Sequence, residues 1–268
     1  MSLLRSVRSE TTKITSTRLW WVLALIMVGY VALCAGGLGA IFGGLGTNTN
    51  GPVLPDAQIP LLIYSFATSV GYVFPVLFGA LAVTSEFRFQ SLTPTFLAIP
   101  RRGVVLTGKL ITLFLAGAGF GVLALLASMG AGAAVLAGFG IDPLLGDPDT
   151  WAFVGRSLLA MALWAAIGVG LGTLVPSQVA AIVIVLAFTQ FVEPLLRLGS
   201  TITDWSAQIG QFLPGSASDA LVGSSIYTAM SGTGGVALEW WQGGLVLAAI
   251  AAVTTLIGFA TSWRRDVS

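Results

Sequence analysis

Residues 103–110 (GVVLTGKL) nearly match a phosphate-binding loop, the first pattern in the sequence that could support catalysis. Such a loop reads G-x-x-x-x-G-K-[ST]: backbone N–H groups hold the phosphates, and the final hydroxyl holds Mg²⁺. Leu110 takes the place of that hydroxyl, and no buried strand precedes the segment. We therefore expect no nucleotide site here, and we interpret Lys109 as a boundary lysine whose ammonium group reaches toward the lipid headgroups.

The sequence lacks the side chains that hydrolytic and metal-dependent enzymes usually require. The 268 residues contain no histidine, which excludes the His-Glu-x-x-His zinc peptidases and the Ser–His intramembrane proteases. The apolar runs hold no aspartate, so the paired aspartates of membrane aspartyl proteases are missing as well. The one cysteine, Cys34, lies in an apolar run and has the character of a small buried hydrophobe. We expect a chain that is not an enzyme and that holds no metal or cofactor of its own.

Glu193 and Arg197 stand four residues apart at the end of an apolar run, a spacing that fits an ion pair on one helix face. Ionisable groups at membrane depth are functional candidates. Two interpretations are open: a structural pair that anchors the helix at the outer interface, or part of a substrate path or gate. Gln190, one turn earlier, and Phe74 are further candidates for that path. Pro194 is expected to break or bend the helix here.

A charged and aromatic segment at 85–102 (SEFRFQSLTPTFLAIPRR) separates two apolar runs. A loop that only fixes the orientation in the membrane needs basic residues alone. This segment adds apolar side chains, namely Phe87, Phe89, Leu92, Phe96, Leu97 and Ile99. Their number predicts a short helix that docks on another surface.

The composition of the whole chain indicates the kind of protein that positions these side chains. Only 9% of the residues are charged and 56% are hydrophobic, with a mean hydropathy of +0.93, whereas a soluble domain carries about 25% charged residues. The formal net charge of +1 provides no field that would attract nucleic acid. We therefore predict an integral membrane protein whose solvent includes lipid.

Six apolar runs are long enough to cross a bilayer, whose hydrocarbon core needs about 20 residues of helix. They cover residues 19–42, 61–84, 106–138, 152–175, 178–192 and 240–263. Pro75, inside the second run, is expected to kink that helix. Close helix–helix packing is favoured by glycine pairs four residues apart, at Gly39/Gly43, Gly117/Gly121 and Gly168/Gly172. The sequence thus predicts an all-α membrane protein with six transmembrane helices.

The basic residues are distributed unevenly about these runs. Ten of the twelve lie in three places: before the first run, from the end of the second run to the start of the third, and after the last run. Most acidic residues lie in the connections that would face the other side of the membrane. Because short loops rich in Lys and Arg stay in the cytoplasm, we expect both termini there. Tryptophans near the ends of the runs fit the headgroup region, and they are Trp20, Trp21, Trp151, Trp240, Trp241 and Trp263.

Two segments outside the runs also carry apolar side chains. In residues 1–18, Leu3, Val7 and Ile14 recur at helical spacing, which fits either a helix on the cytoplasmic membrane surface or a basic tail that only orients the chain. Residues 193–239 are expected on the outer side, with a short amphipathic helix that dips back toward the membrane. That helix would present Ile202, Trp205, Ile209, Phe212 and Leu213.

Three stretches share their pattern with one family of transporters. Residues 9–20 fit S-E-x-x-K-I-x-S-x-R-x-W, and residues 213–215 and 220–221 fit L-P-G and A-L. The segment between them matches at Glu86, Phe87, Arg88, Leu92, Thr95, Pro100, Arg102 and Lys109. In this order the features resemble the permease subunits of type-2 ATP-binding-cassette (ABC) exporters over nearly the whole chain. Gln90 and Ser91 depart from the pattern, which has Gly-Thr there.

The resemblance implies a single permease domain over residues 1–268, with an elbow helix at 1–18, a coupling loop at 85–105 and a re-entrant or extracellular segment at 193–239. Two such chains, identical or homologous, would form the substrate path. Two copies of a separate ABC ATPase subunit, which hold ATP and Mg²⁺, would supply the energy. The residues that dock on the ATPase would be Glu86, Phe87, Arg88, Leu92, Thr95, Phe96, Pro100, Arg101 and Arg102.

Two other functions remain open from the residues alone. A stand-alone secondary transporter needs ion-coupling residues and often carries internal repeats, and the two halves show no evident repeat. The second of these functions is that of a membrane scaffold or sensor subunit that does not itself transport a substrate. Abundant Gly and Ala with few Lys favour a bacterial source, and hence the plasma (inner) membrane.

Overall fold

The computed structural model describes residues 3–45, 58–99, 101–200, 202–225, 227 and 238–263. Within these residues the regular structure is all helical, without a strand, as predicted. In chain order the helices are α1 (Leu3–Ser16), α2 (Leu19–Leu45), α3 (Ile59–Tyr64), α4 (Phe66–Ser69), α5 (Val73–Arg88), α6 (Leu92–Ala98), α7 (Arg102–Gly138), α8 (Pro148–Leu174), α9 (Gln178–Ala187), η1 (Phe188–Val192), α10 (Glu193–Ser200), α11 (Asp204–Gly210), α12 (Pro214–Val222), α14 (Trp240–Gly258) and η2 (Phe259–Trp263). The two η segments are π-helical turns that continue the helices before them.

Six helical segments are long and apolar enough to cross a membrane, which confirms the six predicted runs. They cover Leu19–Gly44, Ile59–Arg88, Arg102–Gly138, Pro148–Leu174, Gln178–Ser200 and Trp240–Trp263. Some of these helical segments extend beyond the predicted bounds. The loop predicted at 85–105 is shorter and contains α6, because the second segment continues to Arg88 and the third begins at Arg102. The fifth segment continues to Ser200, so the region predicted at 193–239 begins inside a helix.

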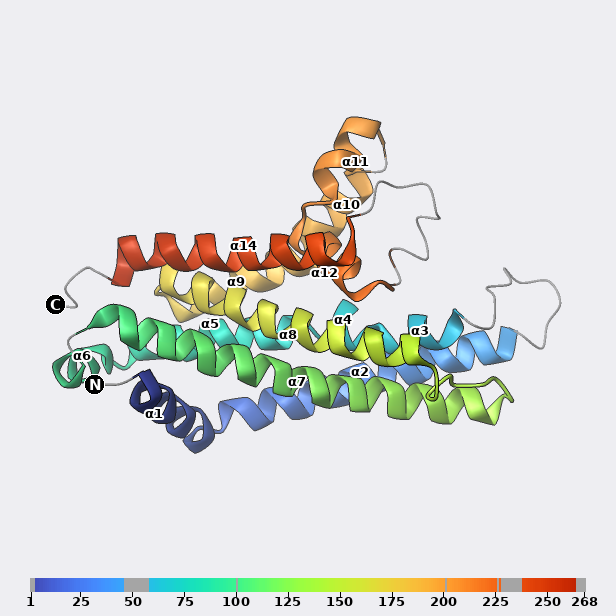
Figure 1. Ribbon diagram of the computed structural model, residues 1–268, viewed down its shortest axis with the longest axis horizontal. Helices are drawn as coiled ribbons and strands as arrows, with labels where there is room; N and C mark the ends of the chain where they lie inside the picture. The colour runs from blue at the N-terminus through green and yellow to red at the C-terminus, as the bar shows by residue number, and fades with distance from the viewer. Residues whose placement is uncertain are drawn as a thin grey trace.

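The long helices lie side by side along the longest axis of the molecule (Figure 1). α8 lies among them and packs against α5, α7 and α14, while α2 packs against α7. An apolar stretch of 18 residues in α8 is 78% buried, compared with 22% for the corresponding stretches of the fifth and sixth segments. α10 and α11 instead project away from the long helices, above α14 in Figure 1. α8 is therefore the centre of the bundle, and the fifth and sixth segments form part of its outer surface.

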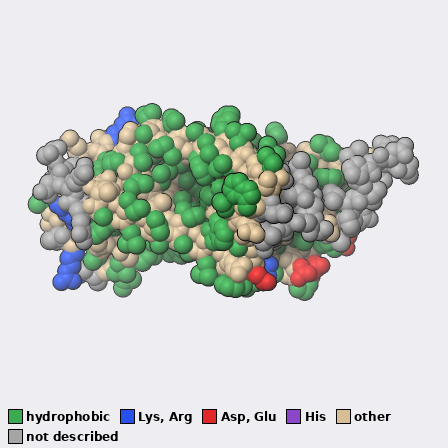
Figure 2. Space-filling view, turned by 90° about the horizontal axis from the view of Figure 1, so that it is seen from above, with side chains coloured by type: hydrophobic (Ala, Val, Ile, Leu, Met, Phe, Trp, Pro, Cys, Tyr) green, Lys and Arg blue, Asp and Glu red, His purple; other side chains and the backbone are tan. Residues whose placement is uncertain are grey.

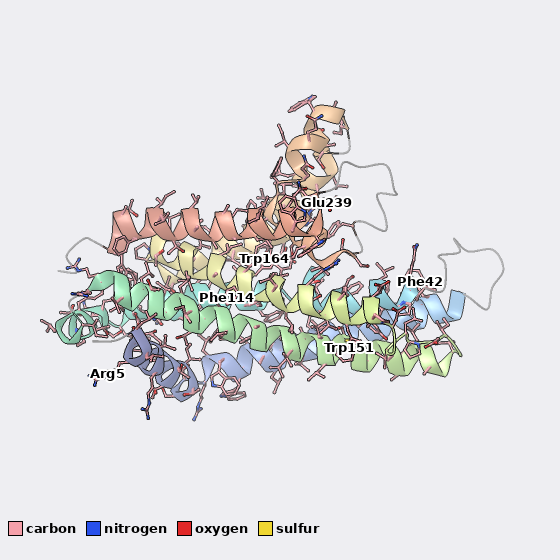
Figure 3. All side chains as sticks on the ribbon, viewed as in Figure 1. Arg5, Phe42, Phe114, Trp151, Trp164 and Glu239 are labelled. Atoms are coloured by element: carbon pink, nitrogen blue, oxygen red, sulfur yellow. The ribbon has the colours of Figure 1, made fainter. Side chains whose placement is uncertain are left out.

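Charged side chains gather toward the two ends of the bundle. On the face in Figure 2, Lys and Arg lie mostly near one end and Asp and Glu near the other, with hydrophobic side chains between them. Figure 3 places Arg5 and Trp151 toward opposite ends, and α1 and α6 share the end of Arg5. Five of the tryptophans predicted at the headgroups are 37–60% exposed, but Trp263 is only 1% exposed. Trp263 thus ends the last membrane-crossing segment with its ring enclosed by the protein.

The second membrane-crossing segment is interrupted, not simply kinked at Pro75. α3, α4 and α5 follow one another, and residues 70–72 separate α4 from α5. Pro75 lies in the first turn of α5, where a helix does not need the missing N–H group. The Gly71 N–H donates to the Phe66 carbonyl, five residues back, at 3.4 Å. The predicted irregularity is thus present in this span, but it precedes the proline.

Glycines allow α5 and α8 to approach each other closely at the centre of the bundle. A Cβ atom at Gly168 would lie 2.1 Å from the Val76 carbonyl oxygen, and one at Gly79 would lie 2.3 Å from the Ala165 carbonyl oxygen. Real Cβ atoms essentially never come so near another heavy atom. The small-residue pattern predicted at Gly168 therefore corresponds to a real backbone-to-backbone contact.

Substitution of Gly168 by alanine is expected to lower the free energy of unfolding by about 1–3 kcal/mol, because the two backbones must move apart. Unfolding of the purified chain by sodium dodecyl sulfate, followed by circular dichroism, measures this change. Gly155→Ala in the same helix is the matched control, since a Cβ atom there meets nothing within 4 Å. Equal stability of the two variants would contradict the close approach.

Candidate functional site

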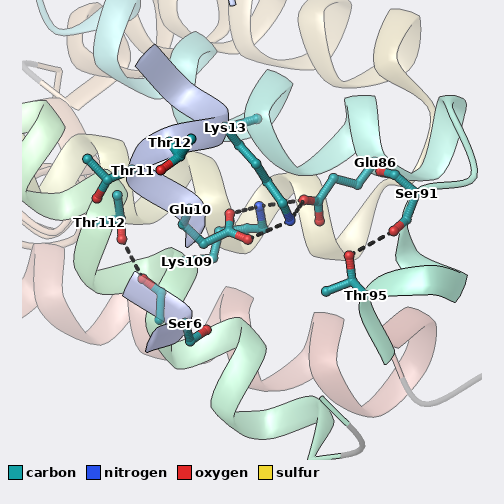
Figure 4. Close-up of polar contacts among 12 residues, drawn as sticks. Ser6, Glu10, Thr11, Thr12, Lys13, Glu86, Ser91, Thr95, Lys109 and Thr112 are labelled. Carbon is teal, nitrogen blue, oxygen red and sulfur yellow. Dashed lines mark hydrogen bonds and ion pairs between the residues drawn. The ribbon is translucent and has the colours of Figure 1, made fainter. Parts of the chain in front are cut away.

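Four ionisable side chains from three helices meet at the end of the bundle that carries α1. We name Glu10, Lys13, Glu86 and Lys109 the four-charge cluster (Figure 4). Lys13 Nζ lies 2.8 Å from Glu10 Oε1 and 2.8 Å from Glu86 Oε1. Lys109 Nζ lies 3.1 Å from the same oxygen of Glu86 and also pairs with Glu10 Oε2. The cluster joins α1, the end of α5 and the start of α7.

The cluster is buried and formally neutral. Glu10, Glu86 and Lys109 are 3%, 6% and 2% exposed, whereas the Lys13 side chain is 38% exposed. Burial by itself raises the pKa of Glu10, but the neighbouring Lys109 and Lys13 ammonium groups outweigh it and leave this pKa below its ordinary value. Burial lowers the pKa of Lys13, but Glu86 and Glu10 outweigh it and raise this pKa. Both groups are therefore charged at neutral pH, and the contacts are ion pairs.

The structure overturns our interpretation of Lys109 as a lysine that reaches toward the headgroups, because its side chain is enclosed. Residues 103–110 lie within α7 and do not form a loop. A Cβ atom at Gly108 would lie 2.4 Å from Ser6 Oγ, so this glycine makes room for α1. The Ser6 hydroxyl donates to the Val104 carbonyl at 3.4 Å. Gly108 and Lys109 of the apparent phosphate motif thus serve the contact between α1 and α7.

α6 is held against the end of the last membrane-crossing segment by aromatic contacts. The rings of Phe87 and Phe96 meet the Trp263 ring edge-on, with centroids 5.8 and 5.7 Å away. Trp263 Nε1 donates to the Arg102 carbonyl at 3.2 Å, and Arg102 Nη1 donates to the Trp263 carbonyl at 3.3 Å. The Arg102 guanidinium also lies 5.0 Å from the centre of the Phe96 ring. Leu92, at 1% exposure, fixes the start of α6 in the core.

The predicted docking residues therefore divide into two groups. Glu86 and Leu92 are buried, and Phe87, Thr95, Phe96 and Arg102 are partly buried, so these six support α6 from within. Arg88 and Arg101 are exposed, and Pro100 lies outside the described residues. Two exposed apolar side chains that we did not assign to the site, Phe89 (72%) and Leu97 (80%), accompany the arginines. We name Arg88, Phe89, Leu97 and Arg101 the α6 patch.

The sequence departs from the transporter pattern in the turn that precedes α6. Gln90 adopts a φ angle of +53°, in the left-handed region that favours glycine. The transporter pattern has glycine at this position, whereas this chain adopts the left-handed conformation with a side chain present. A non-glycine residue in this conformation costs about 1–2 kcal/mol, which the buried contacts of Leu92 and Phe96 must offset.

At the opposite half of the bundle, Glu193 and Arg197 pair as the four-residue spacing predicted, and Asp219 joins them. We name these three residues the Arg197 cluster. Arg197 Nη2 lies 3.3 Å from Glu193 Oε1, and Nη1 lies 2.6 Å from Asp219 Oδ2. The Gly215 N–H also donates to Glu193 Oε1, and the Arg197 guanidinium lies 4.4 Å from the centre of the Tyr227 ring. Burial raises the pKa of Asp219, although the Arg197 charge opposes this shift.

The two other residues predicted for a substrate path do not join the Arg197 cluster. Gln190 is exposed, and its amide donates to the Thr189 hydroxyl at 3.3 Å. Phe74 is partly buried and lies near Tyr30, with ring centroids 6.5 Å apart. The helix continues from η1 into α10 through Pro194, so the break considered there is absent. The π-helical turn before it closes with a bond from the Glu193 N–H to the Phe188 carbonyl.

The short helix predicted after the fifth span is α11, which follows α10. Thr203 caps it through a reciprocal hydrogen-bond pair with Ser206. Apolar side chains on and around it are exposed, namely Ile202 (79%), Trp205 (68%), Ile209 (62%) and Phe212 (53%). The helix is therefore present where the sequence predicted it, with an uncovered apolar surface.

Known proteins give no independent indication of the family. No protein-family model matches the chain, and no curated protein matches it in sequence.

Proposed function

We propose that this chain is the membrane-spanning subunit of an ATP-driven exporter of the type-2 ABC family. A second permease chain, identical or homologous, would complete the substrate path, and two copies of a separate ATPase would supply the energy of ATP hydrolysis. The observation that carries the proposal is the α6 patch. Leu97 is exposed on α6, which Phe96 holds against Trp263, and the residues that flank α6 in the chain add exposed Arg88, Phe89 and Arg101. Such a patch fits a groove on a soluble partner.

The distribution of charge supports an orientation with both termini in the cytoplasm. Basic side chains gather at the end of the bundle that carries α1 and α6 (Figure 2), and such residues stay on the cytoplasmic side. In this orientation α1 acts as the elbow helix of the family, and the α6 patch faces the cytoplasm where ATP is available. The membrane would be the plasma (inner) membrane of a bacterium.

The contacts of α6 suggest how closure of an ATPase dimer would reach the spans. α6 lies between α5 and α7 in the chain and contacts η2 through Trp263. The four-charge cluster links the end of α5 and the start of α7 to α1. A displacement of α6 would therefore move the ends of three membrane-crossing segments together, which is the requirement for switching access from one side to the other.

One observation favours a second candidate, a stand-alone secondary transporter. The second span is interrupted at residues 70–72, and interrupted helices often line the binding sites of such transporters. Copurification separates the candidates, because only an exporter subunit requires an ATPase partner.

Leu97→Asp is expected to remove the ATPase from the tagged chain purified in mild detergent from its native membrane. Burial of one leucine at an interface contributes about 1.5–3 kcal/mol, so the affinity should fall at least tenfold. Leu145→Asp is the matched control, because Leu145 is also exposed (42%) and lies outside the membrane-crossing segments, before α8. Equal recovery of ATPase with both variants would exclude the α6 patch as the docking surface. Absence of ATPase from the unmodified chain would favour the secondary transporter.

A further inference from the structure

A small cavity lies beside the Arg197 cluster, where three irregular parts of the fold meet. The end of α4 and the interruption before α5 form one side, η1 and α10 form another, and the start of α12 closes it. Its volume is about 10 Å³, room for one water-sized ligand. Its lining includes Ser69, Tyr72, Thr189, Glu193, Arg197 and Asp219.

The charged groups that line this cavity do not balance. Glu193 and Asp219 contribute two carboxylates and Arg197 one guanidinium, which leaves a formal charge of −1. Glu193 Oε1 accepts from Arg197 and Gly215, but Glu193 Oε2 has no hydrogen-bond partner among the described residues. The Glu193 side chain is 2% exposed, and a buried carboxylate in excess of the available positive charge is costly. A positive ligand in the cavity would remove this cost.

Three hydroxyl groups around the cavity already donate their protons to backbone carbonyls. Thr68 Oγ1 donates its proton to the Ser65 carbonyl at 3.0 Å, and Thr189 Oγ1 donates to the Val185 carbonyl at 2.8 Å. The Tyr72 hydroxyl likewise donates to a carbonyl, that of Thr189, at 3.4 Å. Their remaining lone pairs can only accept or coordinate. Ser69 Oγ, buried on the same wall, has no hydrogen-bond partner among the described residues.

These properties select one class of ligand. An anion would add to the formal charge of −1, and a water molecule would leave that charge in place. A divalent cation would invert the charge, and within the described residues no three Cys, Asp or Glu side chains converge to hold one. We propose that the cavity binds one alkali cation, Na⁺ or K⁺, with Glu193 Oε2 and Ser69 Oγ as side-chain ligands. Interrupted membrane helices hold such ions in other transport proteins.

This site does not depend on the class of transporter. A failure to copurify an ATPase leaves it unaffected, because the cavity, its charge and its unpartnered oxygens belong to the Arg197 cluster and not to the α6 patch. The reverse also holds, since loss of the cation site leaves the exposed docking surface unchanged.

Thermal unfolding of the purified full chain tests the proposal at fixed pH and constant ionic strength, with NaCl or KCl replacing choline chloride. A ligand at a hundredfold excess over its Kd should raise Tm by about 5–10 °C in a saturable manner. Ser69→Ala should abolish most of this shift. Ser157→Ala is the matched control, because Ser157 Oγ is also buried without a hydrogen-bond partner among the described residues but does not line the cavity.

Glu193→Gln should make Tm independent of the cation, because the neutral side chain removes the excess charge. The absence of a shift with either salt in the unmodified chain would overturn the proposal, as expected if a proton or a water molecule occupies the cavity. A full shift in Ser69→Ala would overturn the assignment of the ligands, and this variant keeps the test decisive where Glu193→Gln fails to fold.

Discussion

Lys109→Met is expected to lower the free energy of unfolding by about 3–5 kcal/mol, because it leaves Glu10 and Glu86 buried with one partly exposed partner. Methionine keeps the length and the apolar stem of the side chain, so the loss of charge is the main change. Unfolding by sodium dodecyl sulfate, followed by circular dichroism in detergent, measures the effect. Release of α1 from α7 should accompany it, visible as protease cleavage within residues 3–16.

Lys13→Met is the matched control for this prediction. Lys13 makes the same kind of contacts within the four-charge cluster, but its side chain is 38% exposed, and a partly solvated pair contributes only about 0.2–1 kcal/mol. The double variant Glu10→Gln/Lys109→Met restores neutrality, so it should be more stable than Lys109→Met alone. Equal losses in the two methionine variants would show that burial does not determine the strength of these pairs.

Arg197→Met should be at least as destabilising, by about 3–5 kcal/mol or more, because it leaves Glu193 and Asp219 side by side without a positive partner. The fraction of monodisperse chain after heating, measured by size-exclusion chromatography, reports the loss as a lower Tm. Addition of Asp219→Asn to this variant removes one of the two charges and should recover part of the stability.

Arg156→Met provides the comparison for Arg197. Arg156 is also partly buried within a membrane-crossing segment, but it lies over the Trp240 ring, 5.0 Å from its centre, and does not line the cavity. Loss of one such contact costs about 0.5–1 kcal/mol. A loss for Arg156→Met as large as that for Arg197→Met would mean that any arginine at this depth matters equally, and that the Arg197 cluster is not special.

The membrane-crossing segments could be predicted from sequence because each is a continuous local signal of about 20 apolar residues. The four-charge cluster could not, because its contacts join positions 73 and 99 residues apart. Lys109 alone is indistinguishable from any lysine at the start of a span. The Glu–x–x–Lys spacing of Glu10 and Lys13 is visible in the sequence, but nothing local identifies Glu86 as the partner that Lys13 shares with Lys109.

Only part of the Arg197 cluster could be predicted, because only part of it is local in sequence. Glu193 and Arg197 lie four residues apart on one helix, so the pair follows from helical geometry. Asp219 lies 22 residues beyond Arg197, in a region that we assigned to the outer side. The interruption at residues 70–72 was missed because Pro75 is the stronger helix breaker in isolation, yet a proline is tolerated in the first turn of a helix.

The four-charge cluster also constrains how this protein can change over evolutionary time. Each of its buried carboxylates shares its neutralising charge with the other, so a substitution at one position alters what is tolerated at the remaining three. Divergent relatives should therefore keep all four charges or exchange them in compensating sets. If α1 served only to orient the chain in the membrane, its residues could change independently of the rest. Because Glu10 and Lys13 pair with Glu86 and Lys109, substitutions in α1 instead depend on residues of two distant spans.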